Sequence, residues 1–111
     1  MKGDHLGEFE ELVLLAVKRL AEDGQDAYGV PIKLLLDRET RRDVSIGAVY
    51  AALDRLEGKR LVSSVETEGE PVRGGRRRRA FRVLAAGHRR LVAMREVRDR
   101  LWRDAPARGR G

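Results

Sequence analysis

The chain has 111 residues, enough for one domain of modest size that would gain stability from self-association. The absence of cysteine excludes disulfides and thiolate metal sites, and the absence of a long apolar run argues against a signal peptide or membrane span, so a soluble cytoplasmic protein is expected. Residues 1–71 carry 10 basic and 15 acidic side chains and residues 72–111 carry 14 basic and three acidic ones, which favours a polyanionic partner, most commonly nucleic acid.

Two amphipathic helices are expected in the first 40 residues. Over residues 6–22, apolar side chains recur at three- and four-residue steps, in a stripe wide enough to be covered by its own domain and by a second subunit. Residues 23–26 (DGQD) end this helix, because glycine adopts the left-handed conformation of a C-cap. The second helix runs from about residue 27 or 28 to 39, because Pro31 is tolerated only near the first turn.

The third predicted helix, residues 45–57, has the pattern of a DNA-recognition helix. Ser45 is a favourable N-cap, and the expected buried stripe consists of Ile46, Val49, Leu53 and Leu56. The opposite face carries small and polar residues, namely Gly47, Ala48, Ala51, Ala52, Tyr50, Asp54 and Arg55. Small residues permit the close approach that a major groove requires, and the polar residues can hydrogen-bond there. Alone, the pattern also fits an ordinary amphipathic helix, but with the two preceding helices it predicts a helix-turn-helix.

A basic β-hairpin is expected next. Residues 61–67 alternate and are rich in β-branched side chains, and a returning strand follows a Gly-, Glu- and Pro-rich loop over residues 68–75. The basic side chains of the tip and second strand are Arg73, Arg76, Arg77, Arg78 and Arg79. Such a hairpin, or wing, beside a recognition helix favours phosphate or minor-groove contact over the alternative of a solvated loop.

The last predicted helix, residues 85–104, carries an apolar stripe that has no obvious surface in so small a domain to pack against. We therefore expect a dimerisation helix, followed by a disordered tail over residues 105–111. Its dimerisation residues are predicted to be Leu91, Met94, Val97 and Leu101. The expected fold is mainly α with a small β-hairpin, organised as a winged helix-turn-helix domain over residues 1–84 and the dimerisation helix.

This pattern resembles the PadR family of bacterial transcriptional regulators, in its short branch with a single C-terminal helix. The matching segments are Leu6-Gly7-x-x-Glu10, Tyr28-Gly29-x-x-Ile32, Ser45-x-Gly47-x-x-Tyr50-x-x-Leu53-x-Arg55-Leu56-Glu57, the basic wing, and Ala86-Gly87. The resemblance implies a winged-helix homodimer that represses transcription and is released by a small molecule or another signal. The sequence departs from the family pattern at Arg60, where Gly is usual, at Leu84, where Thr commonly caps the last helix, and at Ala80-Phe81, where an aromatic pair is common.

The predicted complex is a homodimer on double-stranded DNA, with the two recognition helices in successive major grooves about 34–36 Å apart on a pseudo-palindromic operator. Tyr50 and Arg55 are expected to bind phosphates, whereas Ala48 and Ala51 would contact thymine methyl groups, so that DNA shape contributes much of the specificity. The residues predicted to contact DNA are Ser45, Gly47, Ala48, Tyr50, Ala51, Arg55, Arg73, Arg76, Arg77 and Arg78.

Trp102 suggests a second interaction. With its symmetry mate it could line a central cleft that binds a planar hydrophobic effector, as the resemblance implies, or it could pack the dimer against the first helix.

No catalytic or metal site is expected, and no cofactor. His5 and His88 stand apart, without the spacing of metal ligands, and no nucleophile–base pair is recognisable. Two other classes of function remain open: an architectural nucleic-acid-binding protein indifferent to sequence, and a winged-helix module that binds other proteins.

Overall fold

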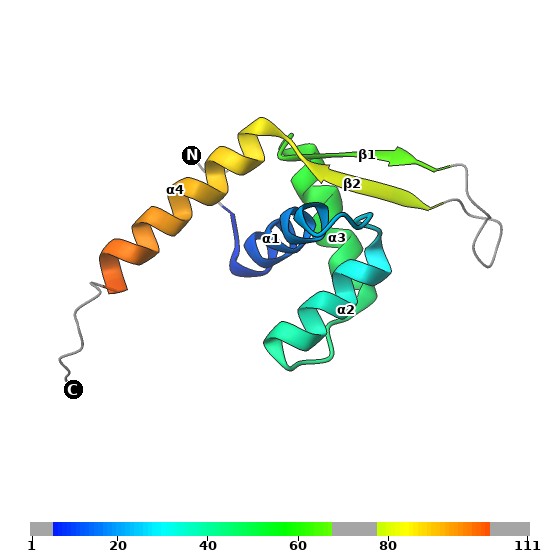
Figure 1. The fold of residues 1–111 in the computed structure, drawn as a ribbon, viewed down its shortest axis with the longest axis horizontal. Helices are drawn as coiled ribbons and strands as arrows, with labels where there is room; N and C mark the ends of the chain where they lie inside the picture. The colour runs from blue at the N-terminus through cyan, green and yellow to red at the C-terminus, as the bar shows by residue number, and fades with distance from the viewer. Residues whose placement is uncertain (1–5, 68–77, 103–111) are drawn as a thin grey trace.

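The computed structural model describes residues 6–67 and 78–102 (Figure 1). Its elements are α1 (Glu8–Glu22), α2 (Gly29–Thr40), α3 (Ile46–Gly58), β1 (Val62–Glu66), β2 (Arg79–Val83) and α4 (Ala85–Trp102). The predicted order of helices and strands is confirmed, with ends that differ by a few residues. No helix of the described residues is long and apolar enough to cross a membrane. The expected tail over residues 105–111 lies outside the described part of the chain.

The core lies where α1, α2 and α3 meet. Each helix contributes a large side chain that is fully buried, Leu14, Ile32 and Leu53 respectively. Two expectations for α3 are wrong: Ala52, placed on the outer face, is fully buried, and Ile46, placed in the buried stripe, is 37% exposed. Ala52 belongs to the buried core cluster, which α3 forms together with the helices and the strand packed against it.

Local hydrogen bonds explain where the helices begin and end. Gly24 has a φ of 75°, and the Gln25 N–H donates to the Leu20 carbonyl at 2.8 Å, which completes the predicted glycine stop after α1. The predicted N-cap of α3 is also present, because the Ser45 hydroxyl accepts a hydrogen bond from the Ala48 N–H at 3.1 Å. Sequence patterns therefore locate both helix ends correctly.

At the end of α3, Arg60 stands where a glycine is usual in the PadR family that the sequence resembles. Arg60 adopts a left-handed conformation with a φ of 62°, and the next residue, Leu61, donates its N–H to the Leu56 carbonyl at 2.9 Å. The helix therefore stops with the hydrogen-bond pattern of a glycine cap, although an arginine occupies the left-handed position.

The two strands form an antiparallel hairpin that is attached to the helical core. Ser64 is paired with Phe81 in the register, and Phe81 is buried beneath the sheet with only 4% of its surface exposed. The Phe81 N–H also donates to the Ala27 carbonyl, at 3.0 Å, in the loop between α1 and α2. A single aromatic residue of the expected pair thus anchors the wing.

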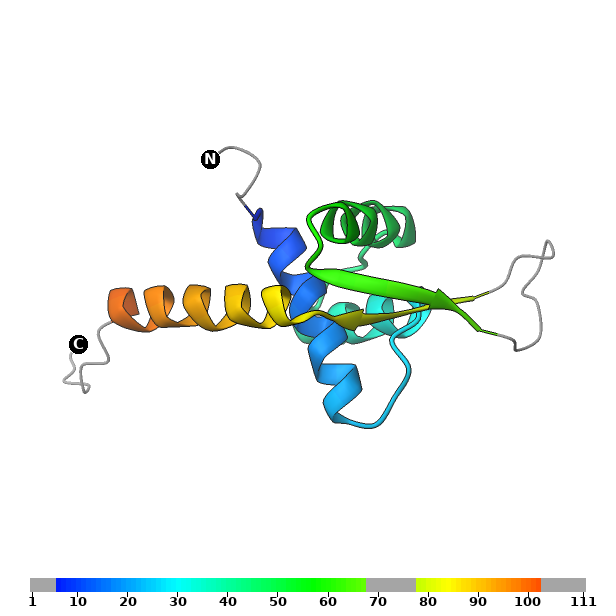
Figure 2. The same ribbon diagram turned by 90° about the horizontal axis from the view of Figure 1, so that it is seen from above.

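The two halves of α4 have different surroundings. Leu91 is buried in the core of its own chain and Met94 packs partly against it, so the expectation that the apolar stripe has nothing to pack against is wrong for the first half. The second half extends away from the domain (Figure 2), where Leu101 is 79% exposed and Trp102 is 82% exposed. The Arg98 guanidinium pairs with the buried Glu11 carboxylate and holds the helix against α1.

Candidate nucleic-acid interface

The outer face of α3 is free for contact with a partner. Gly47, Ala48 and Ala51, which the sequence predicted at this surface, are all exposed. A β-carbon added to Gly58 would meet no atom within 4 Å, and one added to Gly47 would meet only the Ser45 hydroxyl, at 3.5 Å. At Gly47 and Gly58 the backbone of α3 is therefore open to close approach by another surface.

Tyr50 lies at one margin of this face, against the N-terminus of α2. Its side chain is partly exposed, and its ring occupies the space beside Gly29, where a β-carbon would come within 2.8 Å of the Tyr50 Cε1 atom. Gly29 is therefore needed for this ring position. The motif Tyr28-Gly29 was recognised in the sequence. That Gly29 packs against Tyr50, 21 residues later, could not be deduced from the motif.

Arg55 and Lys59 lie at the opposite margin, where both are bound by Glu10 of α1. The Arg55 Nε and the Lys59 Nζ donate hydrogen bonds to the two carboxylate oxygens of Glu10, the latter at 2.9 Å. Burial raises the pKa of the Glu10 carboxyl group, but the hydrogen bonds from Lys59 and Arg55 outweigh burial and leave the pKa below its usual value. Arg55 thus reaches the surface as part of an ion pair.

Sequence reasoning did not identify Glu10 as part of this surface. The available signal was that Glu10 lies three residues before Val13 and four before Leu14, on the buried side of its helix. A carboxylate in such a position needs a cationic partner. Which cation reaches it depends on how α1 crosses α3.

Arg79 connects the wing to α3. Its guanidinium donates hydrogen bonds to the Glu57 carboxylate at 2.7 Å and to the Ser64 hydroxyl at 3.3 Å, and it lies 3.7 Å from the Asp54 carboxylate. Of the wing arginines named from the sequence, this one is engaged within the protein. Arg78 is exposed, with its guanidinium carbon 4.7 Å from the centre of the Tyr28 ring. Arg73, Arg76 and Arg77 lie outside the described residues.

The turn between α2 and α3 is held by a carboxylate. Asp37 accepts a hydrogen bond from the Lys33 Nζ at 2.6 Å and another from the Val44 N–H at 2.7 Å, and Lys33 also binds Asp43. The hydrogen bond from Lys33 and that from the Val44 backbone lower the pKa of Asp37. These contacts fix the path of the chain just before Ser45, and with it the start of α3.

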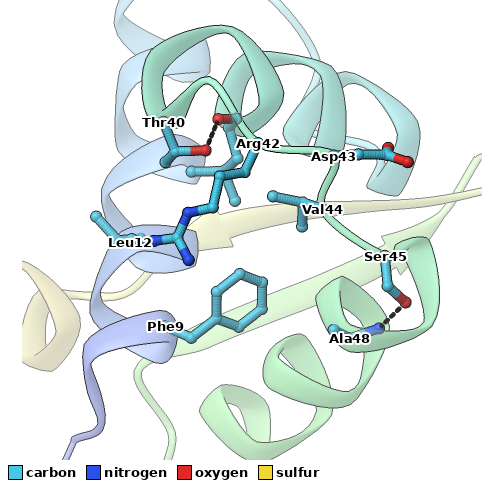
Figure 3. Close-up of a pocket in the computed structure, with 9 residues that line it drawn as sticks. Phe9, Leu12, Thr40, Arg42, Asp43, Val44, Ser45 and Ala48 are labelled. Carbon is cyan, nitrogen blue, oxygen red and sulfur yellow. Dashed lines mark hydrogen bonds between the residues drawn. The ribbon is translucent and has the colours of Figure 1, made fainter.

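A pocket of about 210 Å³ lies beside the first turn of α3 (Figure 3). Its lining residues are Phe9, Leu12, Leu36, Thr40, Arg42, Asp43, Val44, Ser45 and Ala48. The Arg42 side chain reaches across the pocket toward Leu12 and Phe9, and the Thr40 hydroxyl donates to the Leu36 carbonyl at 2.7 Å. None of the lining residues comes from α4, so this pocket is separate from the exposed Trp102.

Within residues 6–67 and 78–102, no group of three or more His, Cys, Asp or Glu side chains could hold a metal ion. His88 is exposed at the start of α4, and His5 lies outside the described residues.

Comparison with solved structures shows that this fold occurs in other proteins, among them PadR family transcription regulators. RosR of H. salinarum is 22% identical, and the match covers 94% of this chain and 83% of that one with a TM-score of 0.73. A PadR family transcription regulator from Clostridium difficile R20291 is 24% identical over 87% of this chain and 92% of that one, with a TM-score of 0.61. A PadR family transcriptional regulator from Eggerthella lenta DSM 2243 is 26% identical, and the match covers 81% of this chain and 73% of that one with a TM-score of 0.63.

A known protein family matches more than half of the chain. No curated protein matches the chain. The model of the family described as "Transcriptional regulator PadR-like family" matches residues 17–93, which is more than half of the chain and includes the core of the helix-turn-helix, the wing and the first half of α4. The chain therefore belongs to the PadR-like family of transcriptional regulators, whose DNA-binding winged-helix fold it shares.

Proposed function

We propose that this regulator is a repressor that binds a pseudo-palindromic operator as a homodimer and leaves it in response to a small molecule or a stress signal. The observation that carries the proposal is the free outer face of α3, where Gly47, Ala48 and Ala51 are exposed between the margins formed by Tyr50 and Arg55. A face of this shape can enter a major groove while the two margins contact the phosphates on either side.

The proposed DNA contacts follow from this placement. Ser45, Gly47, Ala48 and Ala51 would lie closest to the bases, and Tyr50 would bind a phosphate from its position against Gly29. Glu10 takes the Nε donor of Arg55, so a phosphate would be bound by the other N–H groups of that guanidinium. The wing residues Arg73, Arg76, Arg77 and Arg78 are proposed to bind the flanking backbone.

The second half of α4 supports the proposed homodimer. Val97 is 45% exposed and Leu101 and Trp102 are more exposed still, which makes an apolar end that a second copy of the helix could cover. Met94 would contribute from the margin of the core. Leu91 is no longer part of the proposed dimer surface, because it is buried within its own chain.

Trp102 is proposed to bind a planar hydrophobic effector together with its symmetry mate. It is the only tryptophan in the sequence and is 82% exposed in the single chain, so its fluorescence would report directly on a ligand. The competing role is packing of the dimer against α1. No change in fluorescence across a panel of planar drugs and phenolic acids would contradict effector binding at this residue.

Footprinting on the promoter of the protein's own gene tests the proposed function. A specific repressor protects a two-fold symmetric site at physiological salt even against excess unrelated duplex, and it lowers transcription from that promoter in vitro. An architectural protein would be displaced from the promoter by the excess unrelated duplex. A protein-interaction module would bind neither the promoter nor the unrelated duplex. Activation instead of repression on the same template would contradict the proposed sign of regulation.

A further inference from the structure

Asp54 occupies the middle of the outer face of α3. It lies three residues after Ala51 and four before Gly58, so these three residues share one side of the helix. Its side chain is 66% exposed. Tyr50 turns toward α2 and Arg55 turns toward α1, so both are directed away from this central line.

A carboxylate at this position is unexpected in a surface that meets DNA. The phosphates of both strands repel it, and the repulsion grows as the helix enters the groove. Arg79 lies 3.7 Å from the Asp54 Oδ1 atom and offsets part of the charge, but Arg79 is also bound to Glu57. The side chain therefore needs hydrogen-bond donors in the groove.

The chemistry of the base edges selects one donor. A carboxylate only accepts hydrogen bonds, whereas guanine O6 and thymine O4 are themselves acceptors and would repel it. Adenine offers its N6 amine beside the N7 acceptor, which repels the second carboxylate oxygen. Cytosine offers its N4 amine, and the neighbouring group on the same base is the C5–H rather than an acceptor, so the second carboxylate oxygen meets no repulsion from that base.

We propose that Asp54 is a specificity-determining residue that selects cytosine in each half-site by accepting a hydrogen bond from its N4 amine. This inference rests on the proposed role of α3 as the recognition helix. The side chain is short, so contact requires the backbone of α3 to lie close to the groove floor. Gly47, Ala51 and Gly58 permit that approach, since no long side chain extends from the same line.

Selection from a random duplex library tests the inference without knowledge of the operator. The full-length wild type, Asp54→Asn and Asp54→Ala are compared with Glu39→Gln, a control that removes the same charge from an exposed position on α2. The wild type and control should enrich a symmetric motif in which one position per half-site is cytosine. Asp54→Asn should move that position to adenine, because an amide can pair with both N6 and N7. Asp54→Ala should lose preference there and keep the rest of the motif.

Affinity measurements on the selected site supply the second readout. Replacing the cytosine should weaken wild-type binding by about 5- to 150-fold and Asp54→Ala binding by less than about twofold. If both Asp54 variants keep the wild-type motif, or bind all sequences more weakly by the same factor, the inference is wrong and Asp54 only holds Arg79. If the wild type enriches no motif, the proposed sequence-specific function fails as well, so the two failures are distinguishable.

Discussion

The ring of Tyr50 fills the space that a side chain on Gly29 would occupy. The two residues belong to different helices of the helix-turn-helix: Gly29 is the first residue of α2, and Tyr50 lies in the second turn of α3. The glycine therefore leaves room for a side chain that we propose to bind DNA.

Gly29→Ala should weaken operator binding with little effect on stability. The ring is partly exposed and can swing outward, so the free energy of unfolding should change by less than about 1 kcal/mol. Operator affinity, measured by fluorescence anisotropy, should fall about as far as in Tyr50→Ala, and the double variant should lose no more than either single one. Gly7→Ala is the matched control, since its β-carbon would meet no atom within 4 Å. Additive losses in the double variant would refute the coupling.

Gly87→Ala should destabilise the fold, in contrast. A β-carbon there would overlap the Leu61 carbonyl oxygen and lie 2.9 Å from the Val83 Cγ1 atom, and the backbone of Leu61 cannot swing aside. In urea denaturation, the free energy of unfolding of Gly87→Ala should be lower than that of the wild type by about 1–3 kcal/mol. Gly58→Ala, where the added carbon meets open space, should cost nothing. Equal stability of the two variants would show that α4 can shift away from the strands.

Glu10 should make stability depend on pH on the acid side. Its folded pKa lies below the usual value, so the ionised carboxylate stabilises the fold at neutral pH, and this contribution is lost as pH falls through the folded pKa. Glu10→Gln should therefore cost about 1–2 kcal/mol at pH 7 and progressively less toward pH 3, in urea denaturation at a series of pH values. Glu39→Gln serves as the exposed control. A difference that stays constant with pH would assign the loss to packing.

Arg60→Gly should stabilise the protein. Arg60 adopts a φ of 62°, and a left-handed conformation costs a residue with a side chain roughly 1 kcal/mol relative to glycine. Thermal unfolding should show the gain in Arg60→Gly and not in Arg60→Ala, because alanine keeps the conformational cost while removing the same charge. A similar gain in both variants would point to the charge instead.

Leu101 and Leu91 should behave differently although both lie on α4. Leu101→Asp should convert the proposed dimer to a folded monomer, seen as a halved mass by light scattering, because Leu101 is 79% exposed in the single chain. Leu91→Ala should lower the stability of the domain by about 2–5 kcal/mol, because Leu91 is buried in its own core. A Leu101→Asp protein that keeps the wild-type mass would move the dimer surface elsewhere.

The site could be predicted from the sequence where the signal is local. The Ser45 hydroxyl accepts a hydrogen bond from the Ala48 N–H, only three residues later. The exposure of Gly47, Ala48 and Ala51 follows from the helical period. The contacts of Arg55 could not be predicted in this way. Its partner, Glu10, lies 45 residues earlier, and no spacing in the sequence connects them.

The sequence by itself determined the order of the helices and strands, the helix ends at Gly24 and Ser45, and the exposure of Gly47, Ala48 and Ala51 on α3, because these depend on interactions within a few residues. Its motifs also indicated the PadR family. The tertiary structure decided which charged side chains form ion pairs within the protein. It joins Arg55 to Glu10 and Arg79 to Glu57, and it buries Leu91, because the packing of α1, the wing and α4 brings distant parts of the chain together.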